Sequence, residues 1–314
     1  MDDVAQCNIC DITYQKRKNV FSFICREMYD TDSAYMDALK TIEFWGSGWE
    51  KRFHEPDHRF LFEFDQDSII NYVKADVETH KKSQSILSVE LDLSRIEGLI
   101  ALNIGCGAGT ESLVLAYFGA KTIAMDITSQ AANAAAYLLN QINNTGYGIQ
   151  GDARFIPIES LSVDLVYSSG VLHHSPDIQR SVNEIYRVLK PNGIAYVMLY
   201  ASNSLMFGQQ RIIGIVKGNI SKKKQREYMS STGEGAWITK SLKNPYTETF
   251  RKSEIRSLFK DFKSVKIRQA GFSLSQLAWS SKVIDYEKLK NLSDNYLSFL
   301  APYLGACLFI TAIK

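Results

Sequence analysis

The run Leu99-Ile-Ala-Leu-Asn-Ile104, followed directly by Gly105-Cys106-Gly107-Ala108-Gly109-Thr110, decides the fold of this chain. An apolar stretch that ends in closely spaced glycines and continues at helical period from Glu111 to Phe118 predicts a strand, a tight turn and a helix. Bare backbone at such a turn lets a nucleotide-like ligand approach. A dinucleotide fingerprint has its third glycine one position later, where this chain has Thr110. The spacing G-x-G-x-G therefore disfavours NAD.

Two acidic residues follow the next two predicted strands. Ala120 to Met125 predicts a second buried strand that ends in Asp126, about 20 residues past the glycines, where a carboxylate can accept both hydroxyls of a ribose. Tyr147 to Gln150 predicts a third short strand, and Asp152 follows it within reach of the exocyclic amine of an adenine. Two acids at successive strand ends fit an adenosine.

The segment from about Leu99 to Tyr200 resembles the core of a class I S-adenosylmethionine-dependent methyltransferase. It is most similar to the small-molecule group that includes the quinone-biosynthesis C-methyltransferases. The resemblance implies S-adenosylmethionine as the cofactor, S-adenosylhomocysteine as the product, and an α/β fold with a doubly wound, mostly parallel seven-stranded Rossmann-like sheet. The last strand, Gly305 to Ile313, is then antiparallel. The matching motifs are LNIGCGAGT, the acid in AMDIT, GDARFIP, VDLVYSSGVLHHSPD and EIYRVLKPNGIAYVMLY.

The motifs predict a set of cofactor-binding residues at the strand ends. Cys106, inside the glycine turn, is expected to pack below the loop rather than to act as a catalytic thiol. Trp45 lies in Phe44-Trp45-Gly46-Ser47-Gly48-Trp49, where it can fold over a sulfonium cation or simply pack within a cap. The predicted cofactor-binding residues are Gly105, Cys106, Gly107, Gly109, Asp126, Ile127, Asp152, Ala153, Ser169 and Trp45.

The predicted catalytic residues are His173, His174 and Tyr200. Both histidines follow the fourth strand, and histidine titrates near neutral pH, which makes them candidate bases for an acceptor that must lose a proton. The LHH sequence also recurs in this family with unrelated acceptors, which favours a role in shaping the pocket. Tyr200, at the end of the fifth strand, is a candidate for lining the acceptor site or for burial in the sheet.

Periodicity divides the chain into a cap and a core. Residues 1–97 predict a helical N-terminal cap, with helices around Val20 to Leu39 and Asp67 to Leu87 joined by the aromatic segment Phe44 to Phe64. Residues 98–314 predict the cofactor-binding domain, because short strands and helices alternate there. Insertions after the fifth and sixth strands are expected at residues 201–250, as a lid, and at residues 271–304, as an addition to the cap.

Composition excludes several classes of protein. The balance of 36 basic and 34 acidic residues gives a net charge of +2, which argues against a nucleic-acid partner. The chain has no apolar run of 18 residues and no secretory pattern at Met1 to Gln6, so a cytoplasmic protein without a membrane segment is expected. Cys7-x-x-Cys10 has no second ligand pair, and His54 and His58 flank Pro56, so no metal site is expected.

These observations favour methyl transfer to a small-molecule acceptor, an aromatic or apolar-bodied metabolite, by in-line displacement that depends mainly on proximity. A methyltransferase acting on a peptide or another macromolecule is the alternative within enzymes. A non-catalytic S-adenosylmethionine-binding protein is the alternative outside them. The sequence leaves open the acceptor, the methylated atom and the oligomeric state.

Overall fold

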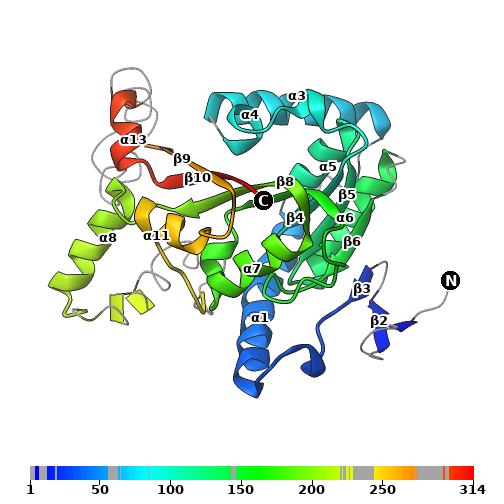
Figure 1. Cartoon of the computed structure of the whole chain (residues 1–314), viewed down its shortest axis with the longest axis horizontal. Helices are drawn as coiled ribbons and strands as arrows, with labels where there is room; N and C mark the ends of the chain where they lie inside the picture. The colour runs from blue at the N-terminus through cyan, green and yellow to red at the C-terminus, as the bar shows by residue number, and fades with distance from the viewer. Residues whose placement is uncertain are drawn as a thin grey trace.

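The structure is a computed structural model of the whole chain, viewed in Figure 1. It describes residues 4–6, 13–17, 20–55, 63, 65–83, 85–142, 146–219, 221, 224–225, 227–228, 244–272, 274, 293 and 297–314.

The core is a twisted sheet whose strand order confirms the predicted fold class. Seven strands follow the order β6-β5-β4-β7-β8-β10-β9. Strands β6, β5, β4, β7 and β8 pair in parallel, and β10 runs antiparallel to both β8 and β9, as the resemblance implied. The order reverses between β4 and β7, which is where a doubly wound sheet opens a crevice for ligands. The strands are β4 (Ile100–Ile104), β5 (Lys121–Asp126), β6 (Tyr147–Gln150), β7 (Val163–Ser169), β8 (Leu189–Tyr200), β9 (Ser264–Ala270) and β10 (Cys307–Ile313).

Three N-terminal strands extend this sheet, so the prediction of seven strands and of a purely helical N-terminal cap was incomplete. They are β1 (Val4–Gln6), β2 (Thr13–Arg17) and β3 (Val20–Ser22), and the described part of the chain forms one ten-stranded sheet. β3 pairs in parallel with β6, where Phe21 lies opposite Ile149. Strands of three to five residues are too short to show a period in the sequence, and the free edge of β6 supplies the pairing that stabilises them.

Helices cover both faces of the sheet (Figure 1). Side chains alternate between the faces, so that Ala101 packs toward α4 and α5 while Leu102 packs toward α7 and α11. The helices are α1 (Asp32–His54), α3 (Gln66–Ser83), α4 (Ile86–Val89), α5 (Thr110–Tyr117), α6 (Ser129–Gln141), α7 (Ile178–Val188), α8 (Leu205–Val216), α11 (Lys252–Leu258) and α13 (Ala301–Leu304), with 3-10 turns η1 (Arg26–Met28), η3 (Leu93–Arg95), η4 (Leu172–His174) and η7 (Ser298–Leu300).

The first part of the aromatic segment that was predicted to join two helices, residues 44–54, lies inside a helix, and most of its remainder lies outside the described residues. Helix α1 runs without a break from Asp32 to His54, and Thr31 caps its first turn by accepting a hydrogen bond from Ala34 N. Gly46 and Gly48 are buried in this helix. A Cβ on Gly46 would lie 3.4 Å from Nε2 of Gln130, so this position of α1 faces α6.

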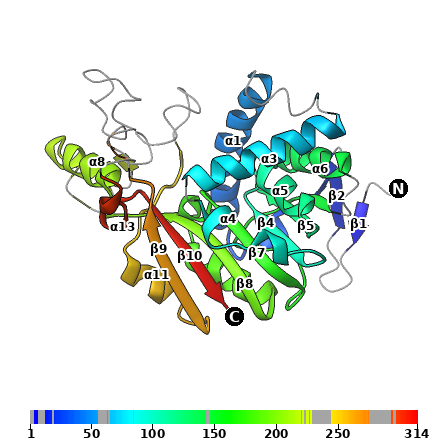
Figure 2. The ribbon, with the colours of Figure 1, turned by 90° about the horizontal axis from the view of Figure 1, so that it is seen from above.

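The insertion at residues 201–250 begins and ends at the tip of β8. Ala201 forms a parallel bridge with Phe250, and the Phe250 N–H donates to the Tyr200 carbonyl. Its first part is the apolar helix α8, which contains Gly214, rather than the polar loop that was expected. Figure 2 places α8 and α13 at the end of the molecule opposite β1 and β2. Much of residues 220–243 and of the predicted cap insertion at 271–304 lies outside the described residues.

Candidate active site

A cavity of about 410 Å³ lies at the carboxyl ends of β4, β5, β6 and β7. Helix α1 forms one wall, and Tyr72 of α3 and Glu111 of α5 contribute to the rim. Ten of the predicted site residues line this cavity: Trp45, Gly105, Cys106, Gly107, Asp126, Ile127, Asp152, Ala153, Ser169 and His174. The cavity lies where the strand order predicts a ligand crevice.

The glycine turn lines the cavity with backbone in the left-handed region. Gly105 has φ of 71° and Gly107 has φ of 54°, and L side chains rarely adopt such angles. A Cβ on Gly105 would lie 2.2 Å from Val171, and one on Gly107 would lie 2.7 Å from Trp49. The missing side chains therefore make room for two protein groups as well as exposing backbone to the cavity.

Gly109, predicted to bind the cofactor, does not line the cavity. It has φ of 89° at the N-cap of α5, and a Cβ there would lie 2.6 Å from the Cα of Ala135 in α6. The third glycine of the turn therefore permits close packing of α5 against α6 and starts the helix. Its effect on a ligand is indirect.

Asp126, at the end of β5, is held by three donors from the chain. Oδ1 accepts hydrogen bonds from the N–H and hydroxyl of Thr128 at 2.9 and 2.8 Å, and Oδ2 accepts from the Gly107 N–H at 3.1 Å. Burial raises the pKa of this carboxyl, and the hydrogen bonds oppose the shift. Because a carboxylate offers about four lone-pair sites, Asp126 retains capacity for a further donor such as a hydroxyl.

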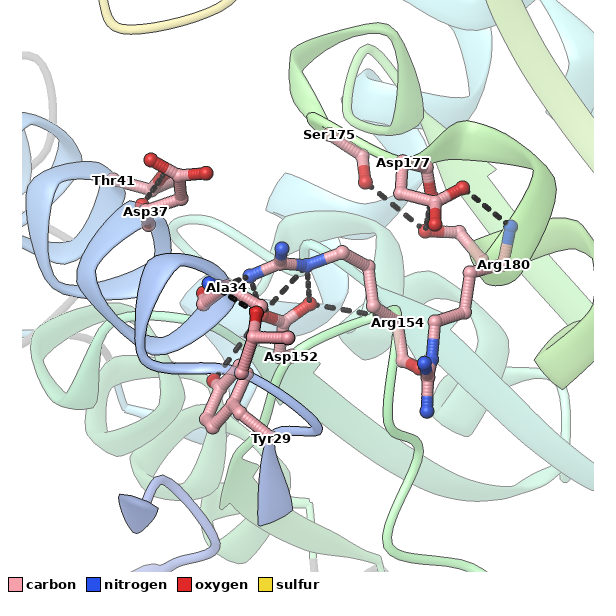
Figure 3. A network of polar contacts seen from close by, with 11 residues as sticks. Tyr29, Ala34, Asp37, Thr41, Asp152, Arg154, Ser175, Asp177 and Arg180 are labelled. Carbon is pink, nitrogen blue, oxygen red and sulfur yellow. Dashed lines mark hydrogen bonds and ion pairs between the residues drawn. The ribbon is translucent and has the colours of Figure 1, made fainter. Parts of the chain in front are cut away.

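The side chain of Asp152, which follows β6, is engaged in hydrogen bonds with other residues of the chain (Figure 3). Its carboxylate accepts from the backbone N–H, Nε and Nη2 of Arg154, with Nη2 at 2.6 Å from Oδ2, and from the Tyr29 hydroxyl at 3.2 Å. Arg154 also donates from Nη2 to the carbonyl of Ala34 in α1. Burial lowers the pKa of Arg154, but the hydrogen bonds and charge of Asp152 outweigh it and the net pKa is raised.

Two tryptophans of α1 reach the cavity from adjacent turns of the helix. Trp45 and Trp49 are four residues apart and so share one face. The Trp45 ring lies 5.1 Å from the ring of His174, between centroids, and Trp49 stacks on Phe53 at 5.6 Å. The guanidinium of Arg52 lies 5.2 Å from the Trp49 ring centroid. Aromatic surface therefore covers the cavity along α1.

His174 lines the cavity, and the end of the insertion holds its ring. Nδ1 lies 3.0 Å from the carbonyl oxygen of Tyr246, 3.1 Å from Nδ2 of Asn244 and 3.2 Å from Oγ1 of Thr247. A proton on Nδ1 satisfies the Tyr246 carbonyl and leaves the lone pair on Nε2.

His173 and Tyr200 lie behind His174 rather than on the cavity wall. Their rings stack on each other at 3.7 Å between centroids, and the His173 ring lies 4.2 Å from the His174 ring. His173 is fully buried, neither of its ring nitrogens has a hydrogen-bond partner among the described residues, and burial lowers its pKa well below the usual value. This environment keeps His173 neutral, so that it supports the ring of His174 by packing.

Sequence reasoning did not place several residues that line the cavity. Arg154 follows Asp152 by two residues, and that spacing of opposite charges was the available signal for their pairing. Thr41 and Tyr72 lie on helices whose orientation toward the cavity depends on the tertiary fold. The further lining residues are Thr41, Trp49, Arg52, Tyr72, Ile104, Ala108, Thr110, Glu111, Gly151, Arg154, Gly170, Val171, Leu172, Ser175 and Pro176.

In the described residues, no group of three or more histidine, cysteine, aspartate or glutamate side chains is placed to hold a metal ion. Cys7, Cys10 and His58 lie outside the described residues. None of the described helices combines the length and apolar character needed to cross a membrane.

Comparison with known proteins assigns the sheet and its motifs to a family. Residues 102–197 match the family described as "Methyltransferase domain". This segment contains β4, β5, β6, β7 and most of β8, together with the glycine turn and both strand-end acids. The chain contains a class I S-adenosylmethionine-dependent methyltransferase domain.

Relatives share the methyltransferase domain more than the whole chain. Sterol 24-C-methyltransferase of Pneumocystis carinii is 26% identical over 61% of this chain and 44% of its own length. Malonyl-[acyl-carrier protein] O-methyltransferase of Yersinia pestis is 32% identical over 34% of this chain and 39% of its own length. The chain thus spans less than half the length of these relatives. A solved methyltransferase of Thermotoga maritima, titled a possible histamine N-methyltransferase, covers 85% of this chain and 98% of its own, with a TM-score of 0.45 and 16% identity.

Proposed function

We propose that this methyltransferase transfers the methyl group of S-adenosylmethionine to a small-molecule acceptor with an aromatic or apolar body. The observation that carries the proposal is one cavity whose lining combines the glycine turn and Asp126 with Trp45 and His174. The glycine turn and Asp126 suit an adenosine, and Trp45 and His174 supply an aromatic surface and an imidazole.

The residues present fit S-adenosylmethionine. Gly105 and Gly107 expose backbone at the carboxyl end of β4, and the buried Asp126 carboxylate has acceptor capacity left for ribose hydroxyls. Ile127 and Ala153 supply apolar surface for a base. When bound, the cofactor supplies a methyl group attached to a cationic sulfur.

The catalytic part of the proposal depends mainly on positioning. Helix α1 and the turn at η4 enclose the cavity, so the chain can hold two reactants in line and limit the water around them. The ring faces of Trp45 and Trp49 favour a cation in that space. The Trp45 ring packs near the His174 ring, so the aromatic surface of α1 lies next to the imidazole.

His174 is proposed as the base for an acceptor that must lose a proton. In the tautomer that donates from Nδ1 to the Tyr246 carbonyl, Nε2 is the basic nitrogen. His173 and Tyr200 are positioning residues in this proposal, because their stacked rings support His174 and neither lines the cavity.

The name of one relative supports a small-molecule acceptor without identifying it. That relative is named for a sterol, whereas another is named for malonyl-[acyl-carrier protein], in which the acyl group is attached to a protein. The chain's net charge of +2 gives it no strong attraction for a phosphate backbone. A peptide methyltransferase and a non-catalytic S-adenosylmethionine binder are the alternatives that the experiment must separate.

The test combines a binding measurement with a turnover measurement. S-adenosylhomocysteine affinity is measured by calorimetry, and methyl transfer from labelled S-adenosylmethionine is followed with small molecules extracted from the purified protein and from cells. Label in a small molecule supports the proposal. Label in a peptide supports the macromolecular alternative, binding with no labelled product supports the non-catalytic alternative, and absence of binding contradicts all three.

A further inference from the structure

The carboxylate of Asp152 has no acceptor site left for the amine of an adenine. Four donor groups share its two oxygens: the backbone N–H, Nε–H and Nη2–H of Arg154, and the hydroxyl of Tyr29. A carboxylate has about four lone-pair sites, so these donors saturate it. Burial, followed by the charge of Asp152, raises the pKa of Tyr29, which keeps its hydroxyl protonated and available as a donor.

The pairing of Asp152 with Arg154 is held in place by burial. The side chains are 6% and 5% exposed, and separating them would leave two desolvated charges without partners. Arg154 is also fastened to α1 through the Ala34 carbonyl, and its guanidinium lies near the rings of Tyr29 and Phe155. A ligand that needed the Asp152 carboxylate would have to displace this buried arginine.

The same arginine presents a donor to the cavity. Nε and Nη2 of Arg154 bind Asp152 and Ala34, while Nη1 makes no hydrogen bond to the described part of the chain. Arg154 lines the cavity beside Ala153, and in Figure 3 its third guanidinium nitrogen points away from Asp152. A buried cation with an unused N–H at this position can donate to an acceptor atom of a bound base.

We propose that Arg154, through Nη1, is the group that recognises the edge of the cofactor's base, in place of the Asp152 carboxylate. The inference rests on the proposed use of an S-adenosyl cofactor. Its consequence concerns specificity: the base is held by donation to one of its acceptor atoms, and its exocyclic amine is not required. Asp152 then acts as a positioning residue that orients Arg154.

A cofactor analogue separates the two modes of recognition. S-inosylhomocysteine has a carbonyl oxygen where S-adenosylhomocysteine has the exocyclic amine, so it offers Arg154 an acceptor and offers Asp152 no donor. If Arg154 reads the base, the two ligands bind the wild-type chain within about fivefold of each other in calorimetry. If Asp152 accepts the amine, losing a hydrogen bond to a charged group weakens the inosine analogue by more than about fivefold.

The variant Arg154→Lys tests the arginine itself. Lysine preserves the positive charge beside Asp152 but has no second nitrogen to reach the base. Because both ligands offer Arg154 an acceptor atom, we expect this variant to weaken both by at least about fivefold, whereas S-ribosylhomocysteine, which has no base, should bind as it does to the wild type. A merely structural role for Arg154 would weaken S-ribosylhomocysteine by the same factor. Asp126→Asn is the matched control, because the ribose is common to all three ligands and their affinity ratios should stay unchanged.

A second variant covers the case in which Arg154→Lys does not fold. Tyr29→Phe removes one donor from Asp152 and leaves the arginine in place. Because this opens an acceptor site on a carboxylate that is otherwise saturated, the adenine ligand should gain affinity relative to the inosine ligand. A wild-type preference for the adenine ligand beyond about fivefold, an unchanged ratio in Tyr29→Phe, or an equal loss of all three ligands in a folded Arg154→Lys overturns the inference and leaves the proposed function intact. Failure of the wild-type chain to bind either ligand overturns both.

Discussion

The indole of Trp49 covers the backbone of Gly107, and a Cβ on Gly107 would lie 2.7 Å from Cζ2 of that ring. Gly107 belongs to the turn between β4 and α5, and Trp49 belongs to the cap helix α1. Any side chain at position 107 therefore requires the Trp49 indole to move. The contact therefore joins helix α1 to the glycine turn, and both line the cavity.

The first prediction measures this contact. Gly107→Ala should destabilise the chain by about 2 kcal/mol or more, because left-handed strain of about 1–2 kcal/mol adds to the clash with Trp49. In urea denaturation, the double variant with Trp49→Ala should show a coupling of about 1 kcal/mol or more, since removing the indole removes the clash.

Gly98→Ala is the matched control for strain without a clash. Gly98 has φ of +76° and no heavy atom within 4 Å of a built Cβ. It should lose about 1–2 kcal/mol and show no coupling to Trp49→Ala. Additive effects of Gly107→Ala and Trp49→Ala would show that the indole does not limit the turn.

The second prediction concerns Asp126 and pH. Asp126→Ala should weaken S-adenosylhomocysteine binding by about 1–3 kcal/mol, the scale of hydrogen bonds to a charged group. Burial raises the pKa of the unliganded carboxyl above its ordinary 3.8, and donation from a ribose favours the ionised form. Wild-type affinity should therefore fall as the pH drops through this raised pKa, at a pH where ordinary aspartates are still ionised.

Calorimetry of wild type and Asp126→Asn over that pH range checks this expectation. The asparagine variant binds less tightly but cannot titrate, so its affinity should change only as far as the ligand's own groups titrate. A parallel pH dependence in the two proteins would assign the effect to another group and remove Asp126 from the ribose site.

The parts of the fold that could be predicted are those with local signals. The apolar run before Gly105 and the acid at Asp126 each mark the end of a buried strand. These patterns depend on a few neighbouring residues. The structure confirms them to within a residue or two.

The parts that could not be predicted depend on contacts between distant segments. Gly46 and Gly48 are poor helix formers, yet they lie inside the continuous helix α1, where Gly46 faces Gln130 of α6. Asp152 matches a strand-end acid that binds an adenine amine, yet the side chain of Arg154 folds back onto it. The direction of a long side chain is set by tertiary packing and is not encoded in spacing.

The third prediction concerns the buried ring of His173. Its pKa is lowered well below 6.5 in the folded state by burial, so the unfolded chain binds more protons below that pH. The free energy of unfolding should therefore decrease as the pH falls below about 6.5, by at most about 1.4 kcal/mol per pH unit for this one group. His173→Phe retains a ring against Tyr200 and loses no hydrogen bond that the described structure shows.

Urea denaturation at several pH values compares the two proteins. The phenylalanine variant should lose less stability than wild type between neutral pH and pH about 5. If the two curves run parallel, His173 titrates normally in the folded state and is not sealed from solvent.

The last prediction separates base catalysis from positioning at His174. With an acceptor that carries a titratable proton, His174→Ala should lower turnover by about 100-fold or more while S-adenosylhomocysteine affinity barely changes. The defect should shrink as the pH rises, because the acceptor then ionises without help, whereas a misplaced cofactor stays misplaced at every pH. His174→Gln serves as the matched variant: it keeps a polar side chain near the carbonyl of Tyr246 but cannot take up a proton.

The turnover of both variants, and their S-adenosylhomocysteine affinity by calorimetry, are measured across the same pH range. Equal damage to binding and turnover, independent of pH, would make His174 a wall of the pocket and leave proximity as the source of catalysis.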